Sequence, residues 1–359
     1  MLRRDVLKGG LAAGTAALLP RAAWAQASAP GWRSFEIRTT LKLRNPGGGA
    51  ARAWVPLPSA VDESWVRAVG STWSGNGRFE AVADPVYGAP MLVASWTGEA
   101  EPRLEIVSRL TTRDRAVDLA RPTPVTPLSE TERLLYTRGT ELLPVTGIVK
   151  AKADEIVAGA AGDLAKARAI YEWVVENTFR DPATLGCGVG DIESLLASGN
   201  LGGKCADLNA LYVGLARAAG LPARDVYGIR IAPSRRGYRS LGANAEVISK
   251  AQHCRAEVWL ADFGWFPVDP ADVRKVVLEE PPGKLAITDP KVVEARKMLF
   301  GGWEMNWMPY NVAHDVTLPG SRRVVPFLMY SQAETADGVL DSLDPDAFGY
   351  AITAREVTA

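Results

Sequence analysis

The amino-acid sequence predicts an α+β chain in which an all-β sandwich precedes a domain of helices packed on an antiparallel sheet. Residues 35–113 form short apolar runs bounded by Gly, Pro or Asp without a helical period, which is typical of a β-sandwich. The segment Arg121-Pro-Thr-Pro-Val-Thr-Pro breaks this pattern and marks a boundary. Helical stretches follow and strands come after them, and this order indicates an α+β arrangement.

The predicted elements divide the chain into five parts. Residues 1–25 precede the folded protein, 32–118 form the β-sandwich, and 119–147 form a linker. Residues 148–290 form the α+β domain, and 291–359 are a C-terminal extension completing its sheet. Within the α+β domain, helices are expected over 148–159, 164–177, 191–197 and from Gly202 to Gly220, and strands over 224–231, 253–260 and 263–268.

The N-terminus has the pattern of an export signal. Arg3 and Arg4 precede a short Ala/Gly/Leu-rich stretch, and Ala23-Trp24-Ala25 is a small-x-small cleavage pattern. The paired arginines resemble a twin-arginine signal, with a general secretory signal as the alternative. The apolar stretch is shorter than the about 20 residues that span a bilayer. We therefore expect a periplasmic or secreted protein with no integral membrane segment after signal removal.

The charge balance excludes some classes of partner. Lys and Arg number 41, as do Asp and Glu. Loss of residues 1–25 removes four basic groups and one acid, which leaves 37 against 40 and a net charge of −3. Because no Lys/Arg run occurs in the sequence, no nucleic-acid partner is expected. The sequence leaves the oligomeric state open.

The few cysteines and histidines narrow the search for a reactive site. Three cysteines are too few for a disulfide scaffold. Because their number is odd, at least one thiol stays free or pairs between chains. Only His253 and His314 can supply imidazole chemistry near neutral pH. Reactive groups at neutral pH are therefore confined to a few positions.

Cys205 lies where a helix is expected to begin, after Gly202-Gly-Lys. Unpaired N–H groups and the helix dipole favour a negative charge there, so its thiol is expected to ionise easily. An inert core cysteine at a helix start is the alternative for this segment alone.

The segment His253 to Asp269 predicts a hairpin. Alternation along the strands, with a turn centred on Ala261, places His253 directly opposite Asp269 and turns Cys254 to the other face. Opposed side chains are close enough for the carboxylate to orient the imidazole. His253 would then take the proton of Cys205 and produce a nucleophilic thiolate. A histidine on a half-exposed strand is the alternative.

These segments resemble the transglutaminase-like superfamily. Gly202-Gly-Lys-Cys205-Ala-Asp-Leu is similar to its nucleophile helix, and His253-x-x-x-Glu257-Val with Gly264-Trp-Phe-Pro-Val-Asp269-Pro270 is similar to its His and Asp segments. The resemblance covers about Ala165 to Pro270, and the preceding β region resembles an immunoglobulin-like module. It implies a papain-like Cys205, His253 and Asp269 triad without a cofactor. Arg255 departs from the pattern because the family commonly has an aromatic residue there.

The function expected from this resemblance is thiol-dependent acyl transfer or hydrolysis at amide bonds of a peptide or protein. Water resolving a Cys205 thioester would make the chain a cysteine protease or amidase, and an amine would make it a transglutaminase; hydrolysis is favoured because nothing in the sequence marks a lysine-binding site. The alternative is a catalytically inactive envelope protein that binds peptide or glycan.

The remaining candidate residues have more than one interpretation. Cys254 is expected in the core, and a Cys187–Cys254 disulfide or an oxidative cap of Cys205 by Cys187 stays open. A metal held by Cys205, His253 and Cys254 is not expected, because structural zinc spacing is absent. For the oxyanion, the Cys205 N–H is expected to donate, with Asn200 or Trp173 as a second donor. The other side chains considered are expected to be structural, with a substrate groove as the alternative for the tryptophans and support of the site as the alternative for the acids: Asp207, Glu257, Trp259, Trp265, Trp303, Trp307 and His314.

Overall fold

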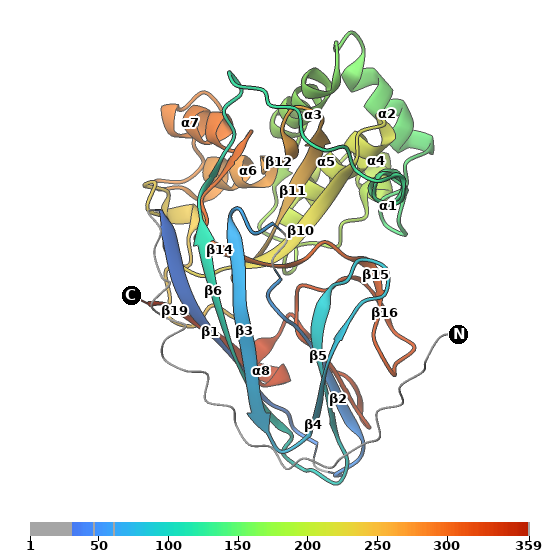
Figure 1. Cartoon of the computed structure of the whole chain (residues 1–359), viewed down its shortest axis with the longest axis vertical. Helices are drawn as coiled ribbons and strands as arrows, with labels where there is room; N and C mark the ends of the chain where they lie inside the picture. Colours follow the sequence, from blue (N-terminus) through green and yellow to red (C-terminus); the bar gives the residue numbers. More distant parts are fainter. Residues whose placement is uncertain (1–30, 46, 60–61, 358–359) are drawn as a thin grey trace, which may run out of the picture.

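The computed structural model describes residues 31–45, 47–59 and 62–357. The expected signal peptide, residues 1–25, lies outside this part of the chain. Two antiparallel sheets built mainly from the N-terminal strands form one end of the molecule, and helices with a third sheet form the other (Figure 1). None of the helices in the described part has the length and apolarity that crossing a bilayer requires.

The N-terminal region consists of two antiparallel sheets, with strand orders β19-β1-β6-β3 and β18-β17-β2-β5-β4. Side chains of β6 alternate strictly between buried and partly exposed positions, as expected for a strand with one face on a core. The strands of this region are β1 (Trp32–Lys42), β2 (Ala51–Pro56), β3 (Val66–Gly75), β4 (Arg78–Ala83), β5 (Pro90–Trp96), β6 (Arg103–Arg113) and β7 (Arg115–Ala116). Strands β3 and β4 were not predicted, because most of their side chains are exposed and carry little apolar alternation.

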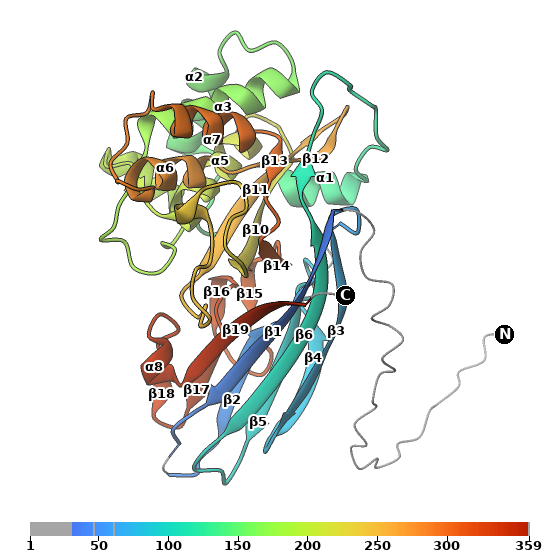
Figure 2. The ribbon, with the colours of Figure 1, turned by 90° about the vertical axis from the view of Figure 1, so that its left-hand side faces the viewer.

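Strands of the C-terminal extension pair with the sheet of the α+β domain and also with the two N-terminal sheets. Strand β14 (Trp307–Asn311) pairs with β10 (Ala223–Arg230) and so joins the sheet of the α+β domain, as expected. Strand β19 (Tyr350–Val357) pairs with β1, and β17 (Gln332–Thr335) pairs with β2, so the end of the chain also completes the N-terminal sheets (Figure 2). The smaller C-terminal elements are β13 (Gly302–Trp303), β15 (His314–Thr317), β16 (Val324–Phe327), β18 (Gly338–Val339) and α8 (Pro345–Phe348).

The α+β domain packs helices on the antiparallel sheet β12-β11-β10-β14, in which β11 spans Gln252–Leu260 and β12 spans Gly264–Val268. Helix α5 (Cys205–Ala218) packs on β10 and β11 and is covered from outside by α2 (Gly147–Val157) and α3 (Asp163–Asn177). Nearly every side chain of α5 is buried. The expected helix positions are confirmed to within a few residues, with α4 at Ile192–Ser198 and α7 at Pro290–Met298, and short β8 (Phe179–Arg180) pairs with β9 (Gly202–Gly203).

Three helices, the short α8 among them, were missed although the sequence carries their start signals. Helix α1 (Glu130–Thr137) lies in the expected linker and begins with a capping box between Ser129 and Glu132. Helix α6 (Pro270–Glu279) begins at Asp269, whose side chain accepts the Asp272 N–H, with proline at the first helical position. Asp269 therefore caps a helix as well as facing His253.

The hairpin of β11 and β12 has a different register from the predicted one. Trp259 pairs with Trp265 and Leu260 with Gly264, so the turn is centred on Asp262 and not on Ala261. A three-residue loop closed by Gly264, whose φ is +70°, explains the shift, since glycine takes this conformation without strain. The shift of two residues preserves which side chains share a face. The prediction that His253 lies directly opposite Asp269 is wrong. Ala256 pairs with Val268, so the next pair in the same register would place Arg255 opposite Asp269.

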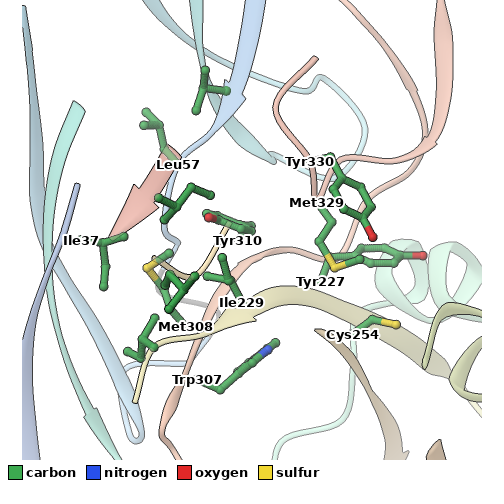
Figure 3. Packing of buried hydrophobic residues seen from close by; sticks show 14 of the residues in the cluster. Ile37, Leu57, Tyr227, Ile229, Cys254, Trp307, Met308, Tyr310, Met329 and Tyr330 are labelled. Carbon is green, nitrogen blue, oxygen red and sulfur yellow. The ribbon is translucent and has the colours of Figure 1, made fainter. Parts of the chain in front are cut away.

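One continuous apolar cluster connects the N-terminal sheets with the α+β domain. Figure 3 shows Ile37 and Leu57 of the N-terminal region in the same cluster as Ile229, Cys254 and Trp307. Cys205 and Ala206, at the start of α5, belong to this cluster as well. The reactive end of α5 therefore lies where the two halves of the molecule share a core.

Candidate active site

Cys205 is the first residue of α5 and lines a cavity of about 510 Å³. Its N–H is one of the helix N-terminal donors that no intrahelical carbonyl can satisfy. The backbone at position 203 passes close to the side chain of Asp207. Only glycine fits at this position, because a Cβ there would lie 2.6 Å from the Cβ of Asp207. Cys205 is only 4% exposed, so the cavity provides its access to solvent.

The structure brings Cys205, His253 and Asp269 together. His253 Nε2 lies 2.7 Å from Asp269 Oδ2, and the imidazole is one of the groups that lower the pKa of the Cys205 thiol. Because Nε2 contacts the carboxylate, the other ring nitrogen, Nδ1, is left for the thiol. Asn209 of α5 donates to Asp269 Oδ1 at 3.1 Å and to the Cys254 carbonyl at 2.8 Å. Helix α5 thus fixes the acid and the strand that carries the histidine.

The surroundings of the pair favour charge separation. Hydrogen bonds from Cys187 and Cys254, followed by that with His253, hold the pKa of the Cys205 thiol well below its usual value in spite of burial. Burial and Arg230 disfavour the imidazolium, but Asp272 and Asp269 outweigh them and raise the pKa of His253 to about 9. The surroundings therefore favour the thiolate of Cys205 and the imidazolium of His253.

A second carboxylate supports the histidine, and the sequence did not predict it. Asp272 Oδ2 lies 3.4 Å from His253 Nε2, and Asp272 Oδ1 accepts from Arg230 at 2.6 Å. Burial opposes ionisation of Asp272, yet Arg230 holds its pKa well below the usual value. The Asp-Pro helix start signals Asp272, because it places this residue in the first turn of a helix capped by Asp269. Arg230 could have been found from strand alternation, because it shares a face with Gly228, the partner of His253.

Arg255 balances the remaining charge of this buried network. Its Nε lies 3.6 Å from Asp269 Oδ2, and its guanidinium lies 4.7 Å from the centre of the Trp307 ring. Burial lowers the pKa of Arg255 to about 10. Two guanidiniums, Arg230 and Arg255, thus face two carboxylates. Arg255, which departs from the family pattern, therefore contacts the acid behind the histidine and does not line the cavity.

His253, Asp269 and Asp272 also have the composition of a metal site, since one donor atom from each lies within 4.8 Å of the others. Both carboxylates already contact guanidiniums, and their charge is balanced by Arg230 and Arg255. A divalent ion would add two charges to a buried network that is already neutral. We therefore interpret the group as an ion-pair network.

All three cysteines are buried free thiols, and the other two lie beside Cys205. No Cys187–Cys254 disulfide forms in the structure. Cys254 lies in the core as expected, but the prediction that it points away from the reactive group is wrong, because its thiol hydrogen-bonds Cys205. The end of α5 meets the start of β11, so two successive side chains of β11, on opposite faces, both reach Cys205.

The Cys187→Ala variant is expected to slow alkylation of Cys205 at pH 6. The neighbouring Cys187 thiol, which also donates to the Gln252 carbonyl at 3.3 Å, is the largest cause that lowers the Cys205 pKa, and its loss raises that pKa. One hydrogen bond of about 0.5–1.5 kcal/mol corresponds to a roughly two- to ten-fold slower reaction. The measurement is the rate of iodoacetamide labelling between pH 5 and 9. Cys187→Ser, which keeps a donor, should retain much of the wild-type rate, and superimposable profiles for all three proteins would contradict the prediction.

Asp207 holds the loop that carries Cys187. Its Oδ1 accepts from the N–H groups of Val189 and Gly190 at 2.9 and 3.0 Å, and its Oδ2 accepts from Lys204 at 2.9 Å. A side chain at Gly188 would collide with this carboxylate. Asp207 was expected to be a simple helix-start charge, and the structure gives it the additional role of positioning the Cys187 loop.

The other residues considered from sequence do not line the cavity. Glu257 is fully buried between Arg115 and Arg224, so it is neither a surface charge nor a contact of the triad. The ring of Trp303 packs on Trp65, as expected for a structural role, and His314 packs beside Tyr227. Neither Asn200 nor Trp173 is among the described lining residues, so the second oxyanion donor expected at these positions is not found there. Tyr330, missed from sequence, lines the cavity and accepts the Cys187 N–H at 3.0 Å.

The comparisons with known proteins define the class. Residues 150–270 match the model of the transglutaminase-like superfamily, so this part of the chain is a transglutaminase-like domain. An uncharacterized protein of Haemophilus influenzae is 36% identical over 342 residues, which is 90% of this chain and 91% of that protein. A crystal structure of a candidate cysteine protease from Cytophaga hutchinsonii has a TM-score of 0.51 at 11% identity, covering 91% of this chain and 99% of its own. At this identity the likeness shows the fold alone.

Proposed function

We propose that the protein is a thiol-dependent hydrolase of peptide amide bonds in which Cys205 forms a thioester. The observation that carries this proposal is the placement of Cys205 and His253 together at the wall of an open cavity, with two carboxylates, Asp269 and Asp272, behind the imidazole. The geometry therefore supports an enzyme better than an inactive binding module.

Each residue has a defined task in this mechanism. The Cys205 thiolate attacks the amide carbon, and the N–H of Cys205 at the helix N-terminus donates to the developing oxyanion. His253 then gives its proton to the leaving amine, while Asp269 and Asp272 hold the ring and stabilise its charge. A water that loses a proton to His253 attacks the thioester carbon, which releases the acid and regenerates the Cys205 thiolate beside the His253 imidazolium.

Incubation of a glutamine-containing peptide is expected to give deamidation or peptide cleavage more often than amine incorporation, even with a primary amine present. The physical reason is water access, since an amine wins only where water is excluded from the acyl site. Mass spectrometry with and without the amine measures the ratio, with the Cys205→Ala protein as the blank. Amine incorporation exceeding hydrolysis would show a transglutaminase, and no Cys205-dependent product from any peptide would favour the inactive binding module.

Export is part of the proposal. The paired arginines, the short apolar stretch and the Ala-Trp-Ala pattern in residues 1–25 support transport across the inner membrane, and twin-arginine transport is the route we favour. A peptide or protein of the cell envelope is then the substrate class that the enzyme meets.

A further inference from the structure

The cavity at Cys205 has a strongly one-sided charge. Five of its lining residues are basic, namely Arg180, Lys204, Arg230, Lys250 and Lys275. Among the described residues that line it, none is Asp or Glu. The sequence as a whole has equal numbers of acidic and basic side chains, so the excess is local and does not reflect a basic protein.

Not all of these cations are neutralised by acids behind the wall. Arg230 is paired with Asp272, and Lys250 is highly exposed with Asp346 at 4.0 Å, so these two add little. Arg180 and Lys275 share a single carboxylate, that of Glu279. The ammonium of Lys204 donates to the Thr184 carbonyl at 2.7 Å, and no carboxylate pairs with it among the described residues. About two positive charges at the wall therefore lack a partner.

The crowding of these cations has a measurable electrostatic cost. Burial and then the positive charge of Arg230 lower the pKa of Lys275, and Arg180 lowers it further, although Glu279 and Asp272 oppose this. A carboxylate entering the cavity would relieve the repulsion. The cations also sit beside the reactive groups, because Lys204 immediately precedes Cys205 and Arg180 on β8 pairs with Gly203 on β9.

We propose that this cavity selects acidic peptides, binding a substrate carboxylate close to the scissile amide at Lys204, Arg180 and Lys275. The inference rests on the proposed function for the identity of the reaction, but the charge preference of the cavity can be measured without turnover. An unpaired cation within reach of a bound carboxylate gives roughly ten-fold discrimination at low ionic strength, and salt screens it.

Two alkylating agents that differ in charge provide the first test. The rate of Cys205 modification by anionic iodoacetate is divided by the rate with neutral iodoacetamide, each followed by mass spectrometry, and free cysteine gives the reference ratio. We expect the protein's ratio to exceed that reference about ten-fold at low ionic strength and to approach it in 1 M NaCl. Rapid labelling by iodoacetamide with the reference ratio at all salt concentrations would overturn the charge selection and leave the nucleophile intact.

Substitution of single lysines shows which cations produce the preference for the anionic reagent. Lys204→Met and Lys275→Met should each reduce the excess ratio several-fold, and the second variant guards against loss of the Thr184 contact in the first. Lys150→Met is the matched control, because Lys150 is exposed on α2, pairs with Asp154 and lies outside the cavity. An equal loss in all three variants would show a general field effect and would contradict binding at the cavity wall.

A binding measurement decides the matter if Cys205 reacts slowly with both agents, a result that would count against the proposed hydrolase. Calorimetric titration of the Cys205→Ala protein would compare the peptides acetyl-Ala-Glu-Ala-Glu-Ala-amide and acetyl-Ala-Gln-Ala-Gln-Ala-amide. Binding of the glutamate peptide about ten-fold more tightly at low salt supports the inference. Equal binding of the two peptides, or no binding of the glutamate peptide, overturns it.

Discussion

The Cys205→Ala variant is expected to lower peptide hydrolysis by about 10⁴-fold or more, which is the scale of losing a nucleophile that acts as part of a triad. The thiolate is the group that forms the thioester in the proposed mechanism. Cys205 is small and lies at a cavity wall, so the free energy of unfolding should fall by only about 1 kcal/mol. Steady-state rates and thermal unfolding on the same preparation measure the two effects.

Cys254→Ala is the matched control for this variant. Both residues are buried cysteines in the same apolar cluster, and their thiols contact each other. Loss of the Cys254 thiol should raise the pKa of Cys205 and slow the reaction near pH 6 by a modest factor, without abolishing it. Comparable loss of activity in the two variants would contradict the assignment of Cys205 as the nucleophile.

The Asp269→Asn variant is expected to reduce activity by about 10³- to 10⁴-fold, as for other triads in which the orienting acid becomes an amide. An amide that donates its N–H to His253 Nε2 leaves the proton on Nδ1, the nitrogen that faces the thiol. The ring can then no longer take the Cys205 proton. Asp272 remains 3.4 Å from Nε2 and preserves part of the imidazolium stabilisation, which is why the loss is expected to be smaller than for Cys205→Ala.

The pH dependence gives this variant a signature that a loss of stability would not produce. The pKa of His253 is raised to about 9, above its unfolded value near 6.5. The stabilisation from its partners is therefore complete below about pH 6.5 and is lost as pH rises through 9. The wild-type activity should fall on the alkaline side near pH 9, and in Asp269→Asn this limb should move to lower pH. An unchanged limb would mean that Asp269 does not support the imidazolium.

Asp289→Asn is the matched control for Asp269→Asn. Each aspartate caps a helix that has proline at its first position, and each side chain accepts a backbone N–H of the first turn. Asparagine caps helices about as well as aspartate, so neither variant should unfold the protein through its cap. Only the variant at position 269 should lose activity, because Asp269 contacts His253 whereas Asp289 accepts the Lys291 N–H.

The sequence predicted the local features of the site for physical reasons that act over a few residues. Glycines before Lys204 and Cys205 permit the turn that begins α5, so the position of the thiol at a helix start was accessible from the sequence. Alternation along the hairpin of β11 and β12 placed His253 and Asp269 on one face, and this prediction survived the error in register because a shift of two residues keeps the face. The same kind of signal, an Asp-Pro helix start, was present for Asp272 and went unused.

Contacts between segments that lie far apart in the sequence were set by the tertiary structure alone. The glycine that closes the hairpin set the register and placed Arg255 opposite the acid, and the meeting of α5 with β11 brought Cys254 to the thiol. Cys187 reaches Cys205 because Asp207 ties its loop to the helix. Arg180 and Lys275 come to one cavity from β8 and α6, although nearly a hundred residues separate them. Such contacts depend on packing between elements, which short-range patterns in a sequence do not encode, whereas the helix start and the strand faces depend on neighbours that it shows directly.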